Sequence, residues 1–283
     1  MGTDVSLTLD DGVALITFKR PDQKNTLTSG MVRGLSDAYQ CCDEDDDVRA
    51  VVVTGSGDSF CAGADLGDGT AFSAVDDAGF SSCPLDFQAY QVRKPVIAAC
   101  NGHAIGVGLG IATQCDLRIL ADDALYGFLQ VRRGVVADFG SHYLLPRVVG
   151  LEAALELLTL GRRYTGNELL AMGFCRRALP AEKVLPEALA LAREYAENCS
   201  PLVVAQSKCL LWKALDQARC SAEAEETTVL TSNMGSQDAL EGGMAFIERR
   251  APRWEASVSA DCPQISRSTH TDKPDEKQST TDS

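Results

Sequence analysis

The stretch KPVIAACNGHAIGVGLGIATQCDLRILADDALYGFLQVRRGVVADFGSHYLLPRVVG, from Lys94 to Gly150, is the segment around which the chain is organised. Its pattern predicts a buried strand at 96–99, a glycine-rich turn that opens a helix at 106–113, and a second strand at 117–121. Buried strands that alternate with helices are typical of an α/β fold in which helices pack on a sheet.

The same stretch contains a candidate anion site and one carboxylate. Amide groups at the start of a helix have no intrahelical acceptor, and they attract anions. Asp138 lies shortly after this helix, between glycines, and precedes a further predicted helix over 141–149. We therefore expect an oxyanion to be stabilised beside a proton carrier.

The chain before this stretch continues the α/β pattern. Residues 5–9 and 13–18 alternate in polarity around a turn, which predicts a hairpin. Ser29 is placed to cap a helix that runs to Cys42. The apolar run 50–54 predicts a buried strand. In the following GSGDSFCAGADL, the glycines leave amide groups available at Gly63 and Ala64. Over residues 67–93 the composition predicts a mobile loop followed by a helix at 85–92, a segment suited to covering a ligand.

The chain after Leu151 is predicted to be helical. We expect helices at 151–160, from a Thr165 cap to Met172, and at 181–198, 201–217 and 221–249. The tail at 257–283 is polar and aperiodic, which predicts disorder. No internal repeat is visible in the sequence.

Charge and cysteine content exclude several classes of protein. The 283 residues carry a net charge of −14, which argues against nucleic acid or an anionic membrane as a partner. The first residues, MGTDVSLTLDDG, lack the basic and apolar regions typical of a secretory leader, and no run of eighteen apolar residues occurs. We therefore expect a cytoplasmic protein or the mature matrix form of an organellar one. The 11 cysteines show no metal-binding spacing, and we expect mostly buried, reduced thiols and no metal site.

Common nucleotide and hydrolase motifs are absent. Gly106 and Gly108 are followed by Ile111, where a dinucleotide fingerprint needs glycine. No Gly-Lys pair, G-x-S-x-G or H-E-x-x-H occurs.

The blocks SFCAGADL, KPVIAACNGHAIGVGLGIATQCDLRILADDALYG and LLPRVVG resemble the crotonase (enoyl-CoA hydratase/isomerase) superfamily. The resemblance implies a spiral of ββα repeats over residues 1–200 and a C-terminal helical region over 201–256. That region mediates trimerisation, so a homotrimer or a dimer of trimers is implied. The expected partner is an acyl-CoA thioester whose enolate the protein stabilises, and CoA is then part of the substrate, with no separate cofactor.

The resemblance also carries over site residues. It implies an oxyanion hole formed by the backbone amides of Ala64 and Val107. It implies CoA contacts near Arg20 and Lys24 and along the backbone from Ala62 to Asp65. The alternative for Arg20 and Lys24 is that they are solvated surface charges.

The acid positions depart from those of hydratases. The two glutamates of hydratases align with Gly110 and Gln130, and neither residue can transfer a proton. Asp138 stands where isomerase-like members carry an acid, which favours a double-bond shift with a single acid. The alternatives are a hydratase, a catalytically weak acyl-CoA-binding protein, or Asp138 as a simple helix cap. His142 is expected either to face the pocket or to cap the helix.

Overall fold

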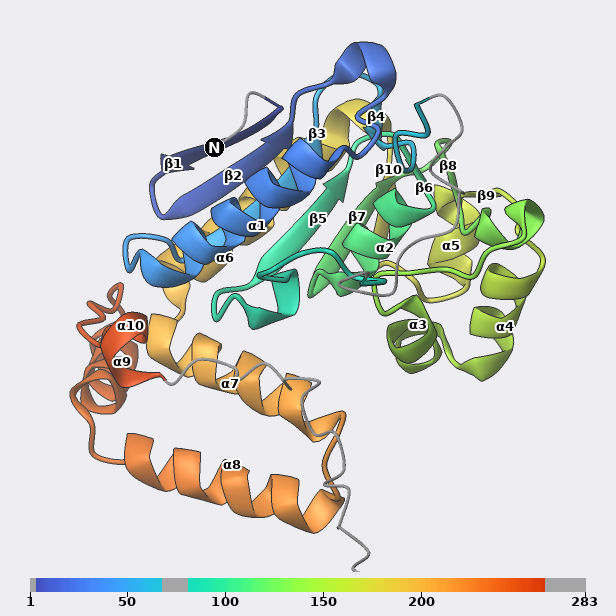
Figure 1. The fold of residues 1–283 in the computed structure, drawn as a ribbon. Helices are drawn as coiled ribbons and strands as arrows, with labels where there is room; N and C mark the ends of the chain where they lie inside the picture. The colour runs from blue at the N-terminus through green and yellow to red at the C-terminus, as the bar shows by residue number, and fades with distance from the viewer. Residues whose placement is uncertain (1–3, 68–80, 263–283) are drawn as a thin grey trace, which may run out of the picture.

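The computed structural model describes residues 4–67 and 81–262, and two β-sheets form the centre of this part of the chain (Figure 1). The larger sheet has the order β1-β2-β3-β5-β7-β10 and is parallel except for the β1–β2 hairpin. Its strands are β1 Val5–Asp10, β2 Val13–Phe18, β3 Ala50–Gly55, β5 Val96–Cys100, β7 Leu117–Ala121 and β10 Arg177–Leu179. The smaller sheet has the order β4-β6-β8-β9. It contains β4 Ser59–Cys61, β6 His103–Ile105, β8 Leu125–Gly127 and β9 Tyr164–Thr165.

From β3 to β8, consecutive strands alternate between the two sheets. Each of the pairs β3–β4, β5–β6 and β7–β8 supplies its first strand to the larger sheet and its second to the smaller one. This arrangement is the spiral of ββα repeats that the resemblance implied. The repeat exists in the backbone path although the sequence shows none.

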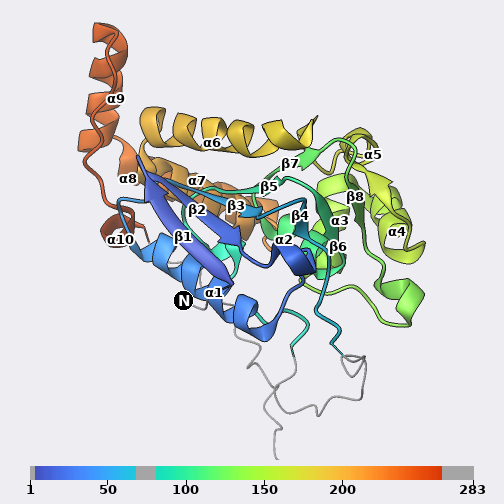
Figure 2. The same ribbon diagram turned by 90° about the horizontal axis from the view of Figure 1, so that it is seen from above.

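Two helices sandwich the larger sheet (Figure 2). Helix α1, Ser29–Glu44, packs on β1 and β2, and α6, Ala181–Asn198, crosses β3, β5 and β7 on the opposite face. Thr28 caps α1, because its hydroxyl accepts the Met31 amide across 3.2 Å. The prediction that Ser29 is the cap was therefore wrong by one residue.

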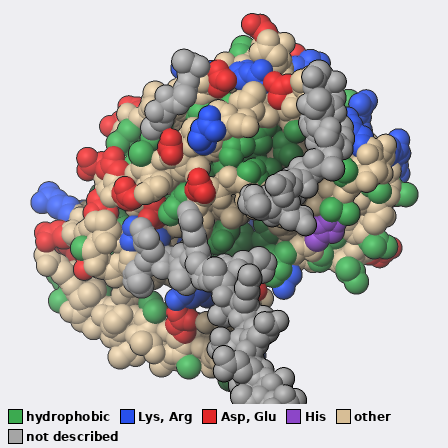
Figure 3. All heavy atoms as spheres, in the orientation of Figure 1, with side chains coloured by type: hydrophobic (Ala, Val, Ile, Leu, Met, Phe, Trp, Pro, Cys, Tyr) green, Lys and Arg blue, Asp and Glu red, His purple; other side chains and the backbone are tan. Residues whose placement is uncertain are grey.

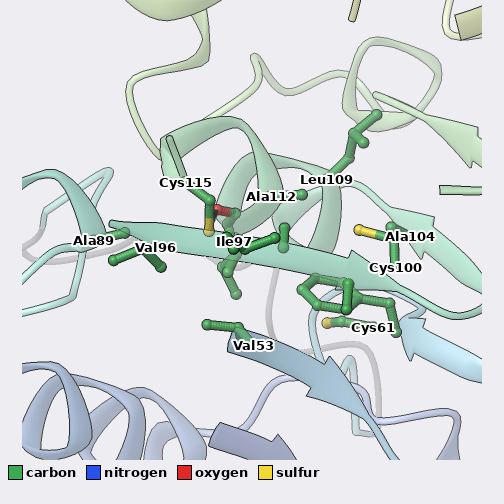
Figure 4. Packing of buried hydrophobic residues seen from close by; sticks show 14 of the residues in the cluster. Val53, Cys61, Ala89, Val96, Ile97, Cys100, Ala104, Leu109, Ala112 and Cys115 are labelled. Carbon is green, nitrogen blue, oxygen red and sulfur yellow. Dashed lines mark hydrogen bonds between the residues drawn. The ribbon is translucent and has the colours of Figure 1, made fainter. Parts of the chain in front are cut away.

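The core lies on both faces of the larger sheet and includes buried residues of α1, α6 and helix α2, Val107–Gln114. Figure 4 shows Val53 of β3, Ile97 and Cys100 of β5, and Leu109 and Ala112 of α2 among the buried residues of this cluster. These side chains are fully buried, which explains why β5 reads as a continuous apolar run. The position of α2 against β4 and β6 is what builds the candidate site.

The remaining helices form two groups. Near the smaller sheet are α3 Ser141–Val149, α4 Leu151–Thr159 and α5 Gly166–Ala171. The C-terminal arm consists of α7 Pro201–Ala214, α8 Arg219–Asn233, α9 Gln237–Glu248 and α10 Val258–Asp261. The prediction of one helix over 221–249 was wrong. Gly235, at φ +81°, separates α8 from α9, and Ser236 caps α9 by accepting the Ala239 amide.

Two further predictions need correction. The helix expected at 85–92 is only a short 3-10 turn, η3 Ala89–Gln91, partly because the Phe87 amide donates to Ser36 on α1. The tail predicted to be disordered over 257–283 begins with an ordered segment, since Ser257 caps α10. Residues 263–283, and residues 68–80 of the predicted mobile loop, lie outside the described residues.

All eleven cysteines are reduced, and seven of them are buried. Cys61 is one of these, and burial raises the pKa of its thiol to about 11. A largely neutral, inaccessible thiol agrees with the prediction that most of the cysteines are buried and reduced.

Candidate active site

The two glycine-rich turns lie side by side. Strands β4 and β6 are parallel neighbours, so the segments that follow them leave the sheet at the same edge. The start of α2 rests on the end of β4 so closely that a Cβ on Gly108 would lie 2.1 Å from the carbonyl oxygen of Cys61. Only glycine permits this approach, which brings the Ala64 turn to the start of α2.

Two amide groups in these turns lack a backbone acceptor. Gly63 at φ +120° and Gly106 at φ +56° adopt conformations that favour glycine, and each precedes one of the expected oxyanion-hole residues. The amides of Ala64 and Val107 donate no backbone hydrogen bond among residues 4–67 and 81–262. Val107 is also the first residue of α2, where the helix dipole adds positive potential. Two such donors match the requirement of an oxyanion.

Asp138 is held beside this region in a half-buried position. Burial raises the pKa of its carboxyl group from 3.8 to about 6, although a hydrogen bond from Gln130 lowers it. The side chain does not cap α3: the cap residue is Gly140, and Asp138 binds Ser141 only through its backbone carbonyl. The side-chain cap considered from the sequence is therefore not observed.

Gln130 connects Asp138 to the glycine turn. It begins the short helix η4, Gln130–Arg133, and its Nε2 donates to Asp138 Oδ1 across 3.3 Å. The same amide lies 3.5 Å from the position that a Cβ on Gly106 would take. Its Oε1 is buried and has no hydrogen-bond partner within the described part of the chain. One side chain therefore binds the acid and lies beside the turn that precedes Val107.

Phe139 occupies the space beside Gly110. A Cβ on Gly110 would lie 2.9 Å from Phe139 Cβ, which is closer than real contacts allow. Phe139 has φ +53°, a conformation that a non-glycine residue adopts only under constraint from its surroundings. The position that aligns with a hydratase glutamate therefore has no room for a side chain unless Phe139 moves.

The expected CoA-binding residues also gather at one place. Lys24 accepts the Ala62 amide through its carbonyl oxygen, and its side chain is exposed. Arg20 is engaged internally: its guanidinium pairs with Asp65 at 2.9 Å and donates to the Thr26 carbonyl. The hydrogen bond from Arg20 also lowers the pKa of Asp65, so this acid stays ionised and is a poor proton carrier.

Sequence reasoning missed Phe139 and the contact between Gln130 and Asp138. Neither has a local sequence signal, because a positive φ at phenylalanine and a side-chain contact across eight residues depend on the folded chain. His142 is exposed on α3. Figure 3 shows apolar side chains gathered in a hollow over the region where Figure 1 draws α2.

Residues 8–257 match the family model of enoyl-CoA hydratase/isomerase. The chain is 37% identical to enoyl-CoA hydratase ACTT3 of Alternaria alternata, over 88% of this chain and 84% of that protein. It is 31% identical to a probable mitochondrial enoyl-CoA hydratase of Dictyostelium discoideum, over 86% and 87%. A probable enoyl-CoA hydratase/isomerase from Mycobacterium abscessus has a similar crystal structure, with a TM-score of 0.86, 41% identity, and coverage of 89% of this chain and 99% of that one.

The fold and these matches define an acyl-CoA enzyme scaffold, and the chain belongs to the enoyl-CoA hydratase/isomerase family of the crotonase superfamily. In the residues that the structure describes, no helix is long and apolar enough to cross a membrane. Within 4–67 and 81–262, no group of three or more His, Cys, Asp or Glu residues is arranged to hold a metal ion.

Proposed function

We propose that this protein is an enoyl-CoA isomerase that shifts a double bond with one acid, Asp138. The observation that carries the proposal is the half-buried carboxyl group of Asp138, whose pKa is raised to about 6. Its partner Gln130 lies beside the turn that precedes Val107. A general base works best when its pKa lies near the working pH, and an ordinary aspartate is too weak a base for this step.

The proposed reaction begins with a 3-enoyl-CoA thioester. Its carbonyl oxygen accepts hydrogen bonds from the amides of Ala64 and Val107, which stabilise the negative charge of a dienolate. Ionised Asp138 takes a proton from C2, and the protonated acid returns a proton to C4 on the same face. The double bond then lies between C2 and C3, and Asp138 is ionised again.

We assign Gln130 a positioning role in this cycle. Its Nε2 donates to the ionised carboxylate of Asp138. Its Oε1, which has no partner within the described residues, is an acceptor for the protonated acid after rotation of the amide. Gln130 thus supports both protonation states of Asp138 without transferring a proton itself.

The second candidate is hydration of a 2-enoyl-CoA, which the names of the relatives favour. Hydration needs one group to activate water and one to deliver a proton to carbon. Gly110 and Gln130 supply neither, and Phe139 occupies the space beside Gly110. Asp138 would have to perform both steps alone.

One experiment separates these reactions. The purified protein is incubated in heavy water with a 3-enoyl-CoA and, separately, with a 2-enoyl-CoA, and products are followed by absorbance and mass spectrometry. An isomerase converts the 3-enoyl thioester to the conjugated 2-enoyl thioester without the mass of added water. Addition of water to the 2-enoyl substrate, with no conversion of the 3-enoyl one, refutes the isomerase assignment.

We further propose that the protein acts in the cytoplasm as a homotrimer or a dimer of trimers on acyl-CoA thioesters. Large exposed apolar side chains support an assembly, because a subunit interface would bury them. They occur on α4 and on the C-terminal arm and include Leu151, Leu211, Met234, Phe246 and Ile247. Size-exclusion chromatography with light scattering tests the assembly, and a monomer would refute it.

A further inference from the structure

Two cysteines far apart in the sequence share a buried contact where α10 packs on α7. Ala205 and Cys209 lie one turn apart on α7, and Val258 and Cys262 lie four residues apart at α10. These four residues form a buried apolar cluster that is separate from the main core. Cys209 and Cys262 are only 8% and 3% exposed.

The two thiols influence each other's protonation within this cluster. The neighbouring Cys209 thiol and the positive charge of Arg93 lower the pKa of Cys262 despite burial, and Cys262 raises the pKa of Cys209. Cys262 is thus the member of the pair that more readily becomes a thiolate, and Cys209 is the adjacent thiol.

Polar contacts on the other side of α10 hold this geometry. The guanidinium of Arg93 donates to the carbonyl oxygens of Val258 and Cys262, at 3.0 Å and 2.5 Å. Arg93 is itself fixed by a buried ion pair with Asp43 at 2.8 Å. Asp46 accepts hydrogen bonds from the hydroxyls of Ser257 and Ser259. Because none of these contacts uses a cysteine side chain, α10 is held in place without a covalent bond between the two sulfurs.

We propose that Cys209 and Cys262 form a reversible disulfide that locks α10 onto α7 when the protein meets a small peroxide. The loop closed by this bond contains all of α8 and α9 (Figure 1). Oxidation therefore restrains the arm while leaving Asp138 and the glycine turns untouched.

The chemistry needs only hydrogen peroxide as oxidant, and its small size suits a buried pair. The Cys262 thiolate attacks one peroxide oxygen, the O–O bond breaks, and a sulfenic acid and hydroxide form. The Cys209 sulfur then attacks the Cys262 sulfur, forms the S–S bond and displaces hydroxide, and the released protons convert both hydroxides to water. Two thiols lose two electrons in total, and one peroxide is reduced to two waters.

Peptide mapping tests the proposal directly. The full chain carries Cys41→Ser and Cys220→Ser, which remove the two exposed thiols and so prevent cross-links between molecules. After treatment with hydrogen peroxide, remaining thiols are alkylated and the unreduced digest is analysed by mass spectrometry. We expect one peptide pair that joins Cys209 to Cys262 and is lighter by two hydrogens. Because the closed loop is long, Tm should rise by roughly 5–10 °C and return on addition of dithiothreitol.

Single replacements provide the controls. Cys209→Ala and Cys262→Ala each abolish the cross-linked pair and the gain in Tm, while Cys100→Ala, buried elsewhere, keeps both. The decisive peptide map is obtained on the protein that keeps both Cys209 and Cys262. Its result therefore does not depend on whether Cys209→Ala or Cys262→Ala folds. Absence of the Cys209–Cys262 pair after full reaction of peroxide, or the same gain in Tm without Cys262, overturns the proposal.

Discussion

The side-chain amide of Gln130 donates to the carboxylate of Asp138 across 3.3 Å, in a position where burial raises the pKa of that acid to about 6. Burial and this hydrogen bond act in opposite directions on the proton of Asp138. Burial disfavours the charged form, and the amide stabilises it. The net effect is that the pKa of Asp138 lies near 6, close to neutral pH. A carboxyl group with such a pKa can both accept and donate a proton.

Asp138→Asn should abolish proton transfer while keeping the ligand. An amide has the same shape as a carboxyl group but cannot accept a proton, so we expect kcat on a 3-enoyl-CoA to fall by about 10²–10⁴ with KM little changed. Steady-state kinetics provides the measurement. Asp37→Asn, on the exposed side of α1, is the matched control and should keep full activity. Equal loss in both variants would remove Asp138 from the mechanism.

The pH dependence of the wild-type protein follows from the same residue. Asp138 must be ionised to take the C2 proton, and its pKa in the folded protein is raised to about 6. The value of kcat/KM should therefore be high above this pH and fall tenfold per unit well below it. A profile that remains flat down to pH 5 would contradict a base with this pKa.

Gln130→Leu should shift this profile upward. Leucine is similar in size but cannot donate the hydrogen bond that lowers the pKa of Asp138, so the acid limb should move above pH 6. The measurement is kcat/KM against pH for both proteins. Gln23→Leu, in the exposed 3-10 turn Pro21–Gln23, should leave the pH dependence of kcat/KM unchanged. A lower rate with an unchanged profile would show that Gln130 is merely structural.

Gly110→Ala should destabilise the protein through Phe139. The new methyl group would lie 2.9 Å from Phe139 Cβ, and overpacking of this kind costs roughly 1–3 kcal/mol of unfolding free energy. Gly243→Ala is the matched helical control, because no atom lies within 4 Å of its new Cβ. It should be neutral or stabilising by up to about 1 kcal/mol.

A second variant isolates the contact. Phe139→Gly removes the opposing Cβ and also relieves the φ of +53°. In that background, urea unfolding should show a smaller cost for Gly110→Ala. An undiminished cost would mean that Phe139 is not what excludes a side chain at position 110.

Asp43→Ala should be strongly destabilising. Asp43 is fully buried and accepts from the backbone amide, Nε and Nη2 of Arg93, so its loss leaves an unpaired buried charge. Such losses cost about 3–5 kcal/mol. The exposed pair of Arg219 and Glu223 is the control, and Glu223→Ala should change the unfolding free energy by less than about 1 kcal/mol. Denaturant titration compares the two, and equal small effects would contradict the burial of Arg93.

The elements that could be predicted correctly depend on neighbours in the chain. Strand β7, α3 and α6 begin and end where apolar periodicity and turn residues place them. The Thr165 cap is equally local, since its hydroxyl and the Glu168 side chain satisfy amides three residues apart. Two errors occurred where a distant contact competes with local preference: Ser36 takes the Phe87 amide, and Asp46 orders the segment after Ser257.

The candidate site divides in the same way. Sequence alone determined the identity of its chemical groups: the glycine turns before Ala64 and Val107, the missing glutamates at Gly110 and Gln130, and the single acid Asp138. Only the tertiary structure decided what these groups can do. A pKa depends on burial and on partners that the fold brings into contact, so the raised pKa of Asp138 and its hydrogen bond from Gln130 arise only in the folded chain. The exclusion of a side chain at position 110 by Phe139 likewise requires the folded chain, because it depends on packing between separate segments.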